Sequence, residues 1–396
     1  MHHWRKGEKK MNTRYSLHCR ICDTFTKSKT QQICVKCSSP LQIQYTEQRK
    51  DSIKTSQRGI WATDAPMPIT NPGNIVTLGE GNTPIISLDK FAAKMGLSKV
   101  YGKLESQNPT SSFKDRGATV LVSFIKELGI NEIVEDSSGN AGAALAAYAA
   151  RARIRTHIFA PSSTPQQKIQ QIKIFGAIIH LDTNDREATT IAAQGFAQKN
   201  GLFYASHNLS PFYLEGTKSF AYEIVQQIPE MDLPHHIIFP VGNGSLFLGA
   251  WKGFRELQIE GKIKEIPYLH CVQAELVSPI VSTFENRNVP KHDIHKPKTV
   301  ASGIAINKAP RAQEVVDVLT NNQGSAVSVT EQEIMGTQNE LAKNEGLFME
   351  PTSAVAFAGL KNLVQRNLIG ANERVLIPVT GSGLKDTSAI ATSDRG

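Results

Sequence analysis

The sequence NPTSSFKDRGA (residues 108–118) places Lys114 where a polar turn meets an apolar run. Pro109 and the hydroxyl residues 110–112 predict a turn followed by a helix N-cap, so Lys114 is expected in the first helical turn. The positive end of the helix dipole and the neighbouring Arg116 both disfavour a further positive charge. We therefore expect Lys114 to lose its proton readily and to act as a nucleophile, with a solvated surface lysine as the alternative.

Strand-like and helix-like segments alternate through the main body of the chain. The apolar runs that predict strands are residues 99–104, 132–135, 155–160, 177–181, 202–205, 236–241 and 374–379. Helical patterns lie between them, including one predicted helix over residues 214–227. This alternation is typical of an α/β fold in which helices flank parallel sheets.

A glycine-rich loop, Gly242-Asn243-Gly244-Ser245, lies between a predicted strand and a predicted helix. Such a loop directs backbone N–H groups and a helix N-terminus at one point, which is how proteins bind phosphate, although glycine-rich turns also occur for steric reasons alone.

Two further polar residues, Asn140 and Thr380, follow predicted strands. Because ligands of open α/β sheets bind at the carboxyl ends of strands, both residues are candidates for the same cleft as the loop at 242–245. A nucleophilic lysine, a phosphate cradle and neutral polar side chains together indicate pyridoxal phosphate, which binds covalently through its aldehyde and separately through its phosphate.

Length, hydropathy and charge limit the classes of protein to which this sequence can belong. The 396 residues can form two packed domains, and no apolar run is long enough to cross a membrane. Residues 1–50 contain 11 of the 44 Lys and Arg residues and 3 of the 36 Asp and Glu residues, so the remaining chain has 33 of each sign. Any attraction to nucleic acid or to a membrane surface would belong to this basic extension. The N-terminus lacks the pattern of a secretory signal, so a cytoplasmic location is expected.

Four of the five cysteines form two CxxC pairs, Cys19/Cys22 and Cys34/Cys37, separated by eleven residues. This spacing predicts a structural zinc ribbon, because a segment this short needs a metal or another cross-link to fold. Disulfides and a metal-free ribbon are the alternatives, and the expected compartment disfavours disulfides. Cys271 lies in an apolar run and is expected in the core.

Five motifs resemble those of the threonine synthases: SFKDRG (112–117), SGN (138–140), VGNG (241–244) with WKGF (251–254), EPTSA (350–354) and TGSGLKD (380–386). The resemblance implies the tryptophan synthase β-like fold (fold type II) of pyridoxal phosphate enzymes, with two parallel-sheet α/β domains and a small N-terminal zinc ribbon. The implied division is a ribbon extension at 1–50, a linker at 51–75, a large cofactor-binding domain at 76–107 and 207–396, and a small inserted domain at 108–206. A homodimer is also implied.

The same resemblance assigns roles to the candidate residues. Lys114 corresponds to the Schiff-base lysine, Asn140 to the residue that contacts the cofactor's 3-hydroxyl, the loop at 242–245 to the phosphate site, and Thr380 to the partner of the pyridine nitrogen. The implied reaction belongs to threonine biosynthesis and converts O-phospho-L-homoserine and water to L-threonine and phosphate, with Lys114 as anchor and base.

Two positions depart from the family pattern. Ala141 replaces a threonine that usually follows the asparagine, and Tyr213 replaces an arginine that could grip a substrate phosphate. The cations that could compensate are Lys218, Lys308 and Arg311. The rival interpretation is a serine or threonine dehydratase, or another β-elimination or β-replacement enzyme whose amino-acid substrate lacks phosphate. A third is a nucleic-acid-binding or docking ribbon attached to an inactive body.

Overall fold

The computed structural model describes residues 14–26, 28–45, 58–164, 166–182, 186–287 and 299–386. Residues 1–13, 27 and 46–50 of the predicted ribbon extension, and residues 51–57 of the predicted linker, lie outside this part of the chain. None of the helices in the described residues is both long and apolar enough to cross a membrane.

The larger sheet contains six strands in the order β12-β11-β10-β13-β5-β4. Every neighbouring pair is parallel except β4 and β5, which are antiparallel. The strands are β4 (Ile85–Ser87), β5 (Lys99–Lys103), β10 (His236–Pro240), β11 (Tyr268–Ala274), β12 (Ala326–Val329) and β13 (Arg374–Pro378). Their side chains are largely buried, as expected for a parallel sheet covered by helices on both faces.

The helices of this larger unit come from two segments of the chain, one before and one after the smaller unit. They are α1 (Asp89–Met95), α6 (Pro211–Thr217), α7 (Ser219–Gln227), α8 (Ser245–Ile259), α9 (Pro279–Phe284), α10 (Ala312–Asn321), α11 (Glu331–Glu345) and α12 (Pro351–Gln365). The single helix predicted over 214–227 is two helices, α6 and α7, which are divided at Lys218. Lys218, which is buried in ion pairs with Glu215 and Glu256, lies at this division, and sequence periodicity does not reveal it.

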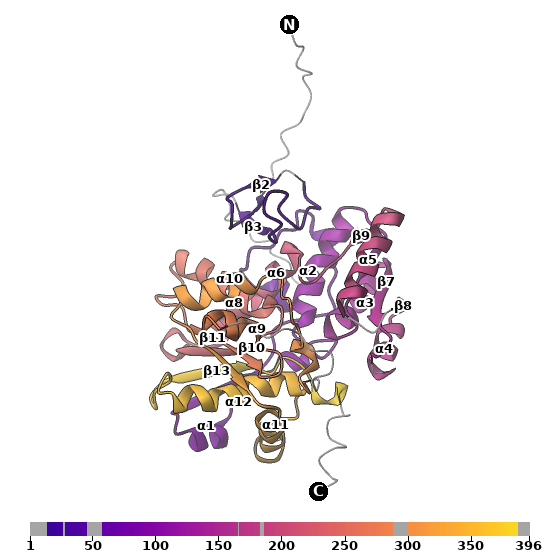
Figure 1. The fold of residues 1–396 in the computed structure, drawn as a ribbon. Helices are drawn as coiled ribbons and strands as arrows, with labels where there is room; N and C mark the ends of the chain where they lie inside the picture. Colours follow the sequence, from indigo (N-terminus) through magenta and orange to yellow (C-terminus); the bar gives the residue numbers. More distant parts are fainter. Residues whose placement is uncertain are drawn as a thin grey trace.

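The smaller sheet is entirely parallel and has the order β8-β7-β6-β9. Its strands are β6 (Glu132–Glu135), β7 (Arg155–Pro161), β8 (Ile178–Asp182) and β9 (Phe203–Tyr204), and its helices are α3 (Asn140–Ala152), α4 (Gln166–Lys173) and α5 (Arg186–Asn200). Helix α2 (Lys114–Glu127) packs against both α3 and α6. In Figure 1 it lies between the two sheets, so the residues at its N-terminus are placed where the two units meet.

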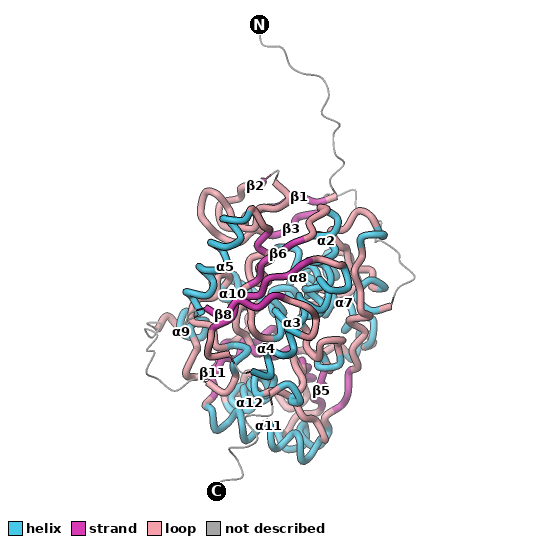
Figure 2. Tube along the Cα trace, turned by 90° about the vertical axis from the view of Figure 1, so that its right-hand side faces the viewer, coloured by secondary structure: helices cyan, strands magenta, loops and turns pink. Residues whose placement is uncertain are grey.

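A three-stranded antiparallel sheet, β2-β1-β3, forms the N-terminal unit from β1 (Tyr15–His18), β2 (Phe25–Thr26) and β3 (Gln42–Tyr45). Figures 1 and 2 place it at one end of the molecule, opposite α11 and α12. It contacts the smaller unit through Gln32, which donates to the carbonyl of Tyr204 at 2.5 Å. It contacts the larger unit through Tyr45, whose hydroxyl donates to Glu215 at 2.5 Å.

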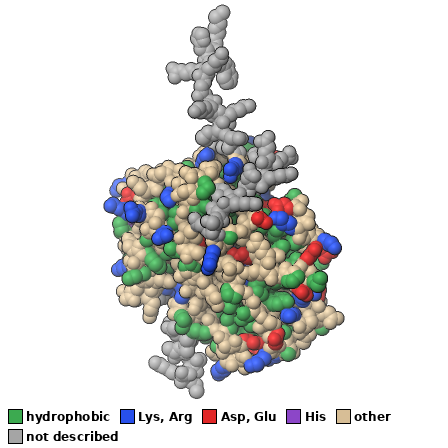
Figure 3. Space-filling model, turned by 180° about the vertical axis from the view of Figure 1, so that it is seen from behind, with side chains coloured by type: hydrophobic (Ala, Val, Ile, Leu, Met, Phe, Trp, Pro, Cys, Tyr) green, Lys and Arg blue, Asp and Glu red, His purple; other side chains and the backbone are tan. Residues whose placement is uncertain are grey.

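Basic and acidic side chains are interspersed on the face shown in Figure 3.

The connection before β4 is anchored by Trp61, whose buried indole N–H donates to Glu80 and to Thr119 of α2.

Candidate active site

Lys114 is the first residue of α2, and the loop before it is bound to the loop that follows β13. The N–H of Phe113 donates to the carbonyl of Thr380 at 3.0 Å, and Ser112 forms an isolated bridge with Gly381. Lys114 and Thr380, which are distant in sequence, therefore lie together. The predicted hydroxyl N-cap is wrong, because Phe113 occupies the cap position and makes no side-chain cap hydrogen bond.

Burial and the charge of Arg186 lower the pKa of Lys114 to about 8, while the carboxylates of Glu135 and Glu350 act in the opposite direction. The reason predicted from the sequence was partly wrong. The guanidinium of Arg116 is fully buried and is neutralised by Glu105 and Glu223, each at 2.7 Å. The charge that depresses the lysine pKa comes instead from α5.

Asn140 begins α3, and its side-chain amide donates to both carboxylate oxygens of Glu350 at 3.1 Å. Glu350 immediately precedes α12, and burial raises its pKa. Gly381 permits this approach, because a Cβ at that position would lie 2.3 Å from the Glu350 carboxylate. The sequence singled out Asn140, while Glu350 was noted only as part of a motif.

The Thr380 hydroxyl is buried and lies 2.8 Å from the hydroxyl of Ser353, whose oxygen also accepts the N–H of Gly381 at 3.0 Å. Ser353 follows Thr352 in α12, and Thr352 accepts the N–H of Gly303 at 3.1 Å. Thr380 is therefore a fixed hydroxyl that can be a donor or an acceptor.

The loop at 242–245 lies at the carboxyl end of β10 and leads into α8, with Gly244 as the N-cap at φ +82°. A Cβ on Gly244 would lie 2.6 Å from Val315, and one on Gly242 would lie 3.0 Å from the Cα of Ile304. The loop therefore needs glycine at position 244 and leaves little room for a side chain at position 242. Because the first N–H groups of a helix have no partners within it, this fifteen-residue helix can bind an anion. Contacts through Ile304 and the Gly303–Thr352 hydrogen bond connect the loop to Thr380.

The residues present fit pyridoxal phosphate. A buried lysine of lowered pKa, a helix N-terminus behind a glycine loop, an asparagine amide and a fixed hydroxyl surround one region. The buried Ser112 hydroxyl, two residues before Lys114, also has no hydrogen-bond partner in the described part of the chain. Such an orphaned polar atom is expected where a polar group is to be bound.

Tyr213, which stands where the family pattern has an arginine, is a packing residue in this structure. Its fully buried ring packs on Gly117 of α2, where a Cβ would lie 2.3 Å from the ring. Its hydroxyl donates to the carbonyl of Lys114 at 3.0 Å. Tyr213 thus supports the backbone of the lysine.

The three cations proposed from the sequence as substitutes for the missing arginine are engaged elsewhere. Lys218 is buried between Glu215 and Glu256, and Arg311 is buried with Glu314 and backbone carbonyls. Lys308 is exposed and pairs with Glu187 at 2.9 Å. None of the contacts of these three cations involves a residue assigned to the cofactor.

A buried pair that the sequence analysis missed, Glu135 and His207, lies beside Lys114. Glu135 Oε1 is 2.5 Å from His207 Nδ1, and its other oxygen accepts the backbone N–H of His207 at 3.3 Å. Burial and the neighbouring Asp136 raise the pKa of Glu135, whereas burial and the charges of Lys114 and Arg186 lower that of His207. Only the position of Glu135 at the end of a predicted strand could have suggested its location.

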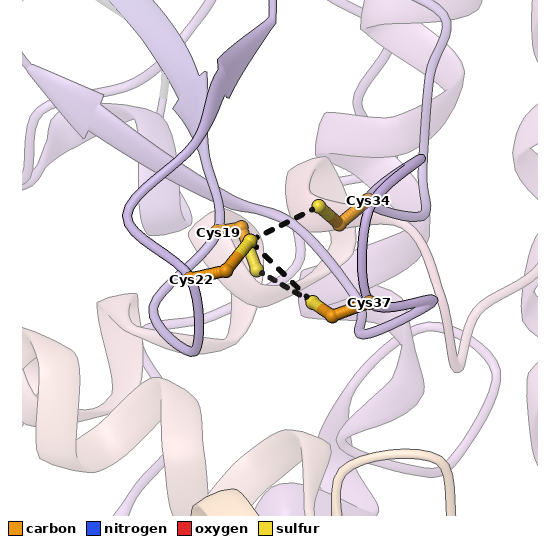
Figure 4. A group of neighbouring side chains, drawn as sticks. All are labelled: Cys19, Cys22, Cys34 and Cys37. Carbon is orange, nitrogen blue, oxygen red and sulfur yellow. Dashed lines mark hydrogen bonds between the residues drawn. The ribbon is translucent and has the colours of Figure 1, made fainter.

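The four cysteines of the N-terminal unit converge, and Figure 4 shows their sulfurs directed toward one another. Cys19 and Cys37 Sγ atoms are 3.4 Å apart, as are those of Cys22 and Cys34, and all four lie within 4.8 Å of one another. Four thiolates around one point suit a tetrahedral metal ion. Cys271 is buried, as predicted.

Comparison with known proteins identifies the group to which these features belong. The family model described as "Pyridoxal-phosphate dependent enzyme" matches residues 76–381. The chain belongs to this family. It is 36% identical over 362 residues to a threonine synthase of Methanocaldococcus jannaschii, with 89% of each chain covered. It is 33% identical to a threonine synthase of Methanosarcina acetivorans, over 95% of this chain and 93% of the relative.

Membership of the family implies pyridoxal phosphate as the cofactor, and the predicted relation to threonine-synthase-like lyases is confirmed. Solved structures of a Solanum lycopersicum threonine deaminase and a maize serine racemase each give a TM-score of 0.65, at 22% and 21% identity. The similarity to the threonine deaminase covers 79% of this chain and 87% of the deaminase chain. The similarity to the serine racemase covers 78% of this chain and 91% of the racemase chain. The predicted tryptophan synthase β-like fold is thereby confirmed as well.

Proposed function

We propose that this lyase converts O-phospho-L-homoserine and water to L-threonine and phosphate, with pyridoxal phosphate bound to Lys114. The observation that carries the proposal is the placement of Lys114: it is buried, its pKa is about 8, and its loop is bound to the loop of Thr380. Relatives named threonine synthase, 31–36% identical over most of the chain, support the choice of reaction.

Pyridoxal phosphate supplies an electron sink that stabilises negative charge on the carbons of a bound amino acid. The backbone N–H groups of residues 242–245 would bind its phosphate, Asn140 its ring hydroxyl and Thr380 its ring nitrogen. A neutral hydroxyl at that nitrogen does not hold it protonated, as a carboxylate would. Lys114 Nζ would anchor the cofactor and would hold and return the proton of the substrate α-carbon.

The direct test is an assay of the purified protein for phosphate and threonine release from O-phospho-L-homoserine. Lys114→Ala should abolish both products, whereas Lys126→Ala, at the other end of α2, should retain them. Borohydride reduction followed by peptide mapping should modify Lys114. Reduction at another lysine would overturn the site assignment, and an active Lys114→Ala variant would overturn its catalytic role.

A second candidate function has one specific observation in its favour. Tyr213 is a neutral phenol whose ring is buried against Gly117, so it offers no positive charge to a substrate phosphate. A serine or threonine dehydratase, or another β-elimination or β-replacement enzyme, needs no phosphate site. Release of ammonia and a 2-oxo acid from serine or threonine, without phosphate release from phosphohomoserine, would favour this function.

We also propose that Cys19, Cys22, Cys34 and Cys37 bind one structural zinc ion. Their closed set of four sulfurs leaves no position for substrate, so the ion would stabilise the ribbon without taking part in the reaction. The proposed division into residues 1–50, 51–75, 76–107 with 207–396, and 108–206 is supported by the three separate sheets. A homodimer in the cytoplasm completes the proposal, and light scattering of the purified protein tests the oligomeric state.

A further inference from the structure

Helix α6 contacts both segments that would hold the cofactor. The Tyr213 hydroxyl donates to the carbonyl of Lys114 at 3.0 Å, and the Thr217 hydroxyl lies 2.9 Å from the carbonyl oxygen of Ser245, in the loop at 242–245. Between these two residues, Gly216 leaves no room for a side chain, because a Cβ there would lie 1.9 Å from the carbonyl oxygen of Arg116 in α2. A displacement of α6 would therefore disturb the lysine and the glycine-rich loop together.

The N-terminal unit holds the same helix from its other side, and Figure 1 shows α6 below β3 and beside α2. The Tyr45 hydroxyl in β3 donates to the carboxylate of Glu215 at 2.5 Å. Glu215 is fully buried and also pairs with Lys218 at 2.6 Å and with Lys252. Lys252 in α8 donates in turn to the carbonyl of Ile43 at 2.6 Å. One buried polar network thus connects β3, α6 and α8.

Arg311, at the start of α10, adds a second connection between β3 and α6. Its guanidinium is buried and donates to the carbonyl of Leu41 at 3.0 Å, directly before β3. It also donates to the carbonyls of Leu209 at 3.0 Å and Asn208 at 3.2 Å, shortly before α6. The segments that lead into β3 and into α6 are therefore bound to the same side chain.

The segment before β3 is in turn connected to the four cysteines. Three residues, 38–40, separate Cys37 from Leu41. The backbone N–H of Leu41 donates to the carbonyl of Gln32 at 2.8 Å, two residues before Cys34. Because so short a unit needs a metal or another cross-link to keep its fold, loss of a bound metal would loosen the contact of β3 with α6.

We propose that the N-terminal unit positions α6, with Tyr45 and Glu215 as positioning residues, so that metal binding at the four cysteines and cofactor binding at Lys114 strengthen each other. This inference rests on the cofactor and zinc sites of the proposed function and is independent of the identity of the substrate. The two sites then share one coupling free energy, which by thermodynamic linkage changes both affinities by the same factor.

The experiment measures both affinities on the full-length chain. Apoenzyme is titrated with pyridoxal phosphate, followed by absorbance, with zinc bound and after zinc is removed by a chelator. Removal of zinc should weaken cofactor binding about 10-fold, and bound cofactor should raise the affinity for zinc, measured by competition with a chromophoric chelator, by the same factor. In Tyr45→Phe, which loses only the hydroxyl, cofactor binding to the zinc-loaded chain should weaken and the mutual factor should fall to about threefold or less.

Thr26→Val is the matched control, because its hydroxyl donates to Gln31 at 2.6 Å within the N-terminal unit. It should leave the cofactor affinity and the mutual factor unchanged. If the zinc-free chain does not stay folded, the cofactor affinities of the two zinc-loaded variants decide the question.

Three results would overturn the inference: no zinc binding by the wild type, equal cofactor affinity of the folded wild type with and without zinc, or equal effects of the two substitutions. A general loss of stability in Tyr45→Phe would lower both affinities without changing the mutual factor, and it would assign Tyr45 a structural role only. Because the readouts are binding affinities, the inference can fail while the proposed reaction holds, and the reverse.

Discussion

Gly117→Ala tests whether the packing of Tyr213 beneath Lys114 is as tight as the structure indicates. The new Cβ would lie 2.3, 2.4 and 2.5 Å from three carbons of the Tyr213 ring, whereas carbon atoms in contact lie about 3.5–4.0 Å apart. The ring must therefore move by about 1 Å or more. Because Tyr213 is fully buried, we expect an overpacking cost of about 1–3 kcal/mol.

Movement of the ring should also break the 3.0 Å hydrogen bond to the carbonyl of Lys114, which is worth about 1 kcal/mol. Urea unfolding followed by circular dichroism should thus show a loss of about 2–4 kcal/mol. The control is Gly336→Ala in α11, where no heavy atom lies within 4 Å of the added Cβ. There, the greater helix propensity of alanine should stabilise the protein by up to about 1 kcal/mol.

The double variant Gly117→Ala with Tyr213→Ala isolates the clash, because no ring remains to be displaced. In the Tyr213→Ala background, Gly117→Ala should cost much less free energy of unfolding than it does in the wild type. Equal costs in both backgrounds would refute the packing argument. The argument would also be refuted if the Gly117→Ala variant were as stable as the wild type and kept its cofactor absorbance.

Three further predictions concern the lysine, its surroundings and the ribbon. Only the neutral amine reacts with the cofactor aldehyde, and the pKa of Lys114 is lowered to about 8. The rate at which apoenzyme takes up the cofactor, measured by absorbance, should therefore rise through pH 8. A rise only near pH 10 would contradict the argument that burial lowers this pKa. Removing the charge in Glu350→Gln should move this rise to lower pH, because that carboxylate favours protonated Lys114; an unchanged profile would disprove the coupling. Cys22→Ser should lower the zinc content measured by mass spectrometry from about one ion per chain toward zero, whereas Cys271→Ala should retain the metal; a retained ion in the first variant would exclude a four-cysteine site.

The sequence predicted those parts of the candidate site whose backbone conformation is determined by residues within the same short segment. Gly242 and Gly244 follow a strand and precede a helix, and in the structure Gly244 has a positive φ while Gly242 lies close against Ile304. Lys114 similarly begins a helix whose apolar face is visible in the sequence. In such segments, the pattern of neighbours along the chain determines the backbone, and the backbone determines where the side chain lies.

The parts that it could not predict depend on partners far along the chain. Arg116 looks like a free charge beside Lys114, yet it is neutralised by Glu105 and Glu223, 11 and 107 residues away. Glu135 and His207 are separated by 72 residues and meet only because β9 pairs with β6. Periodicity contains no information on such pairs, so the electrostatics of the site required the fold.

The substitution at position 213 is best understood together with its neighbours. A long cationic side chain here would meet Gly117, His207 and the carbonyl of Lys114, all of which the flat ring of Tyr213 contacts at once. The ring supports the backbone of Lys114 and packs edge-to-face on the imidazole of His207 at the same time. Tyr213 thus brings no cation to the site and instead packs between the lysine backbone and His207.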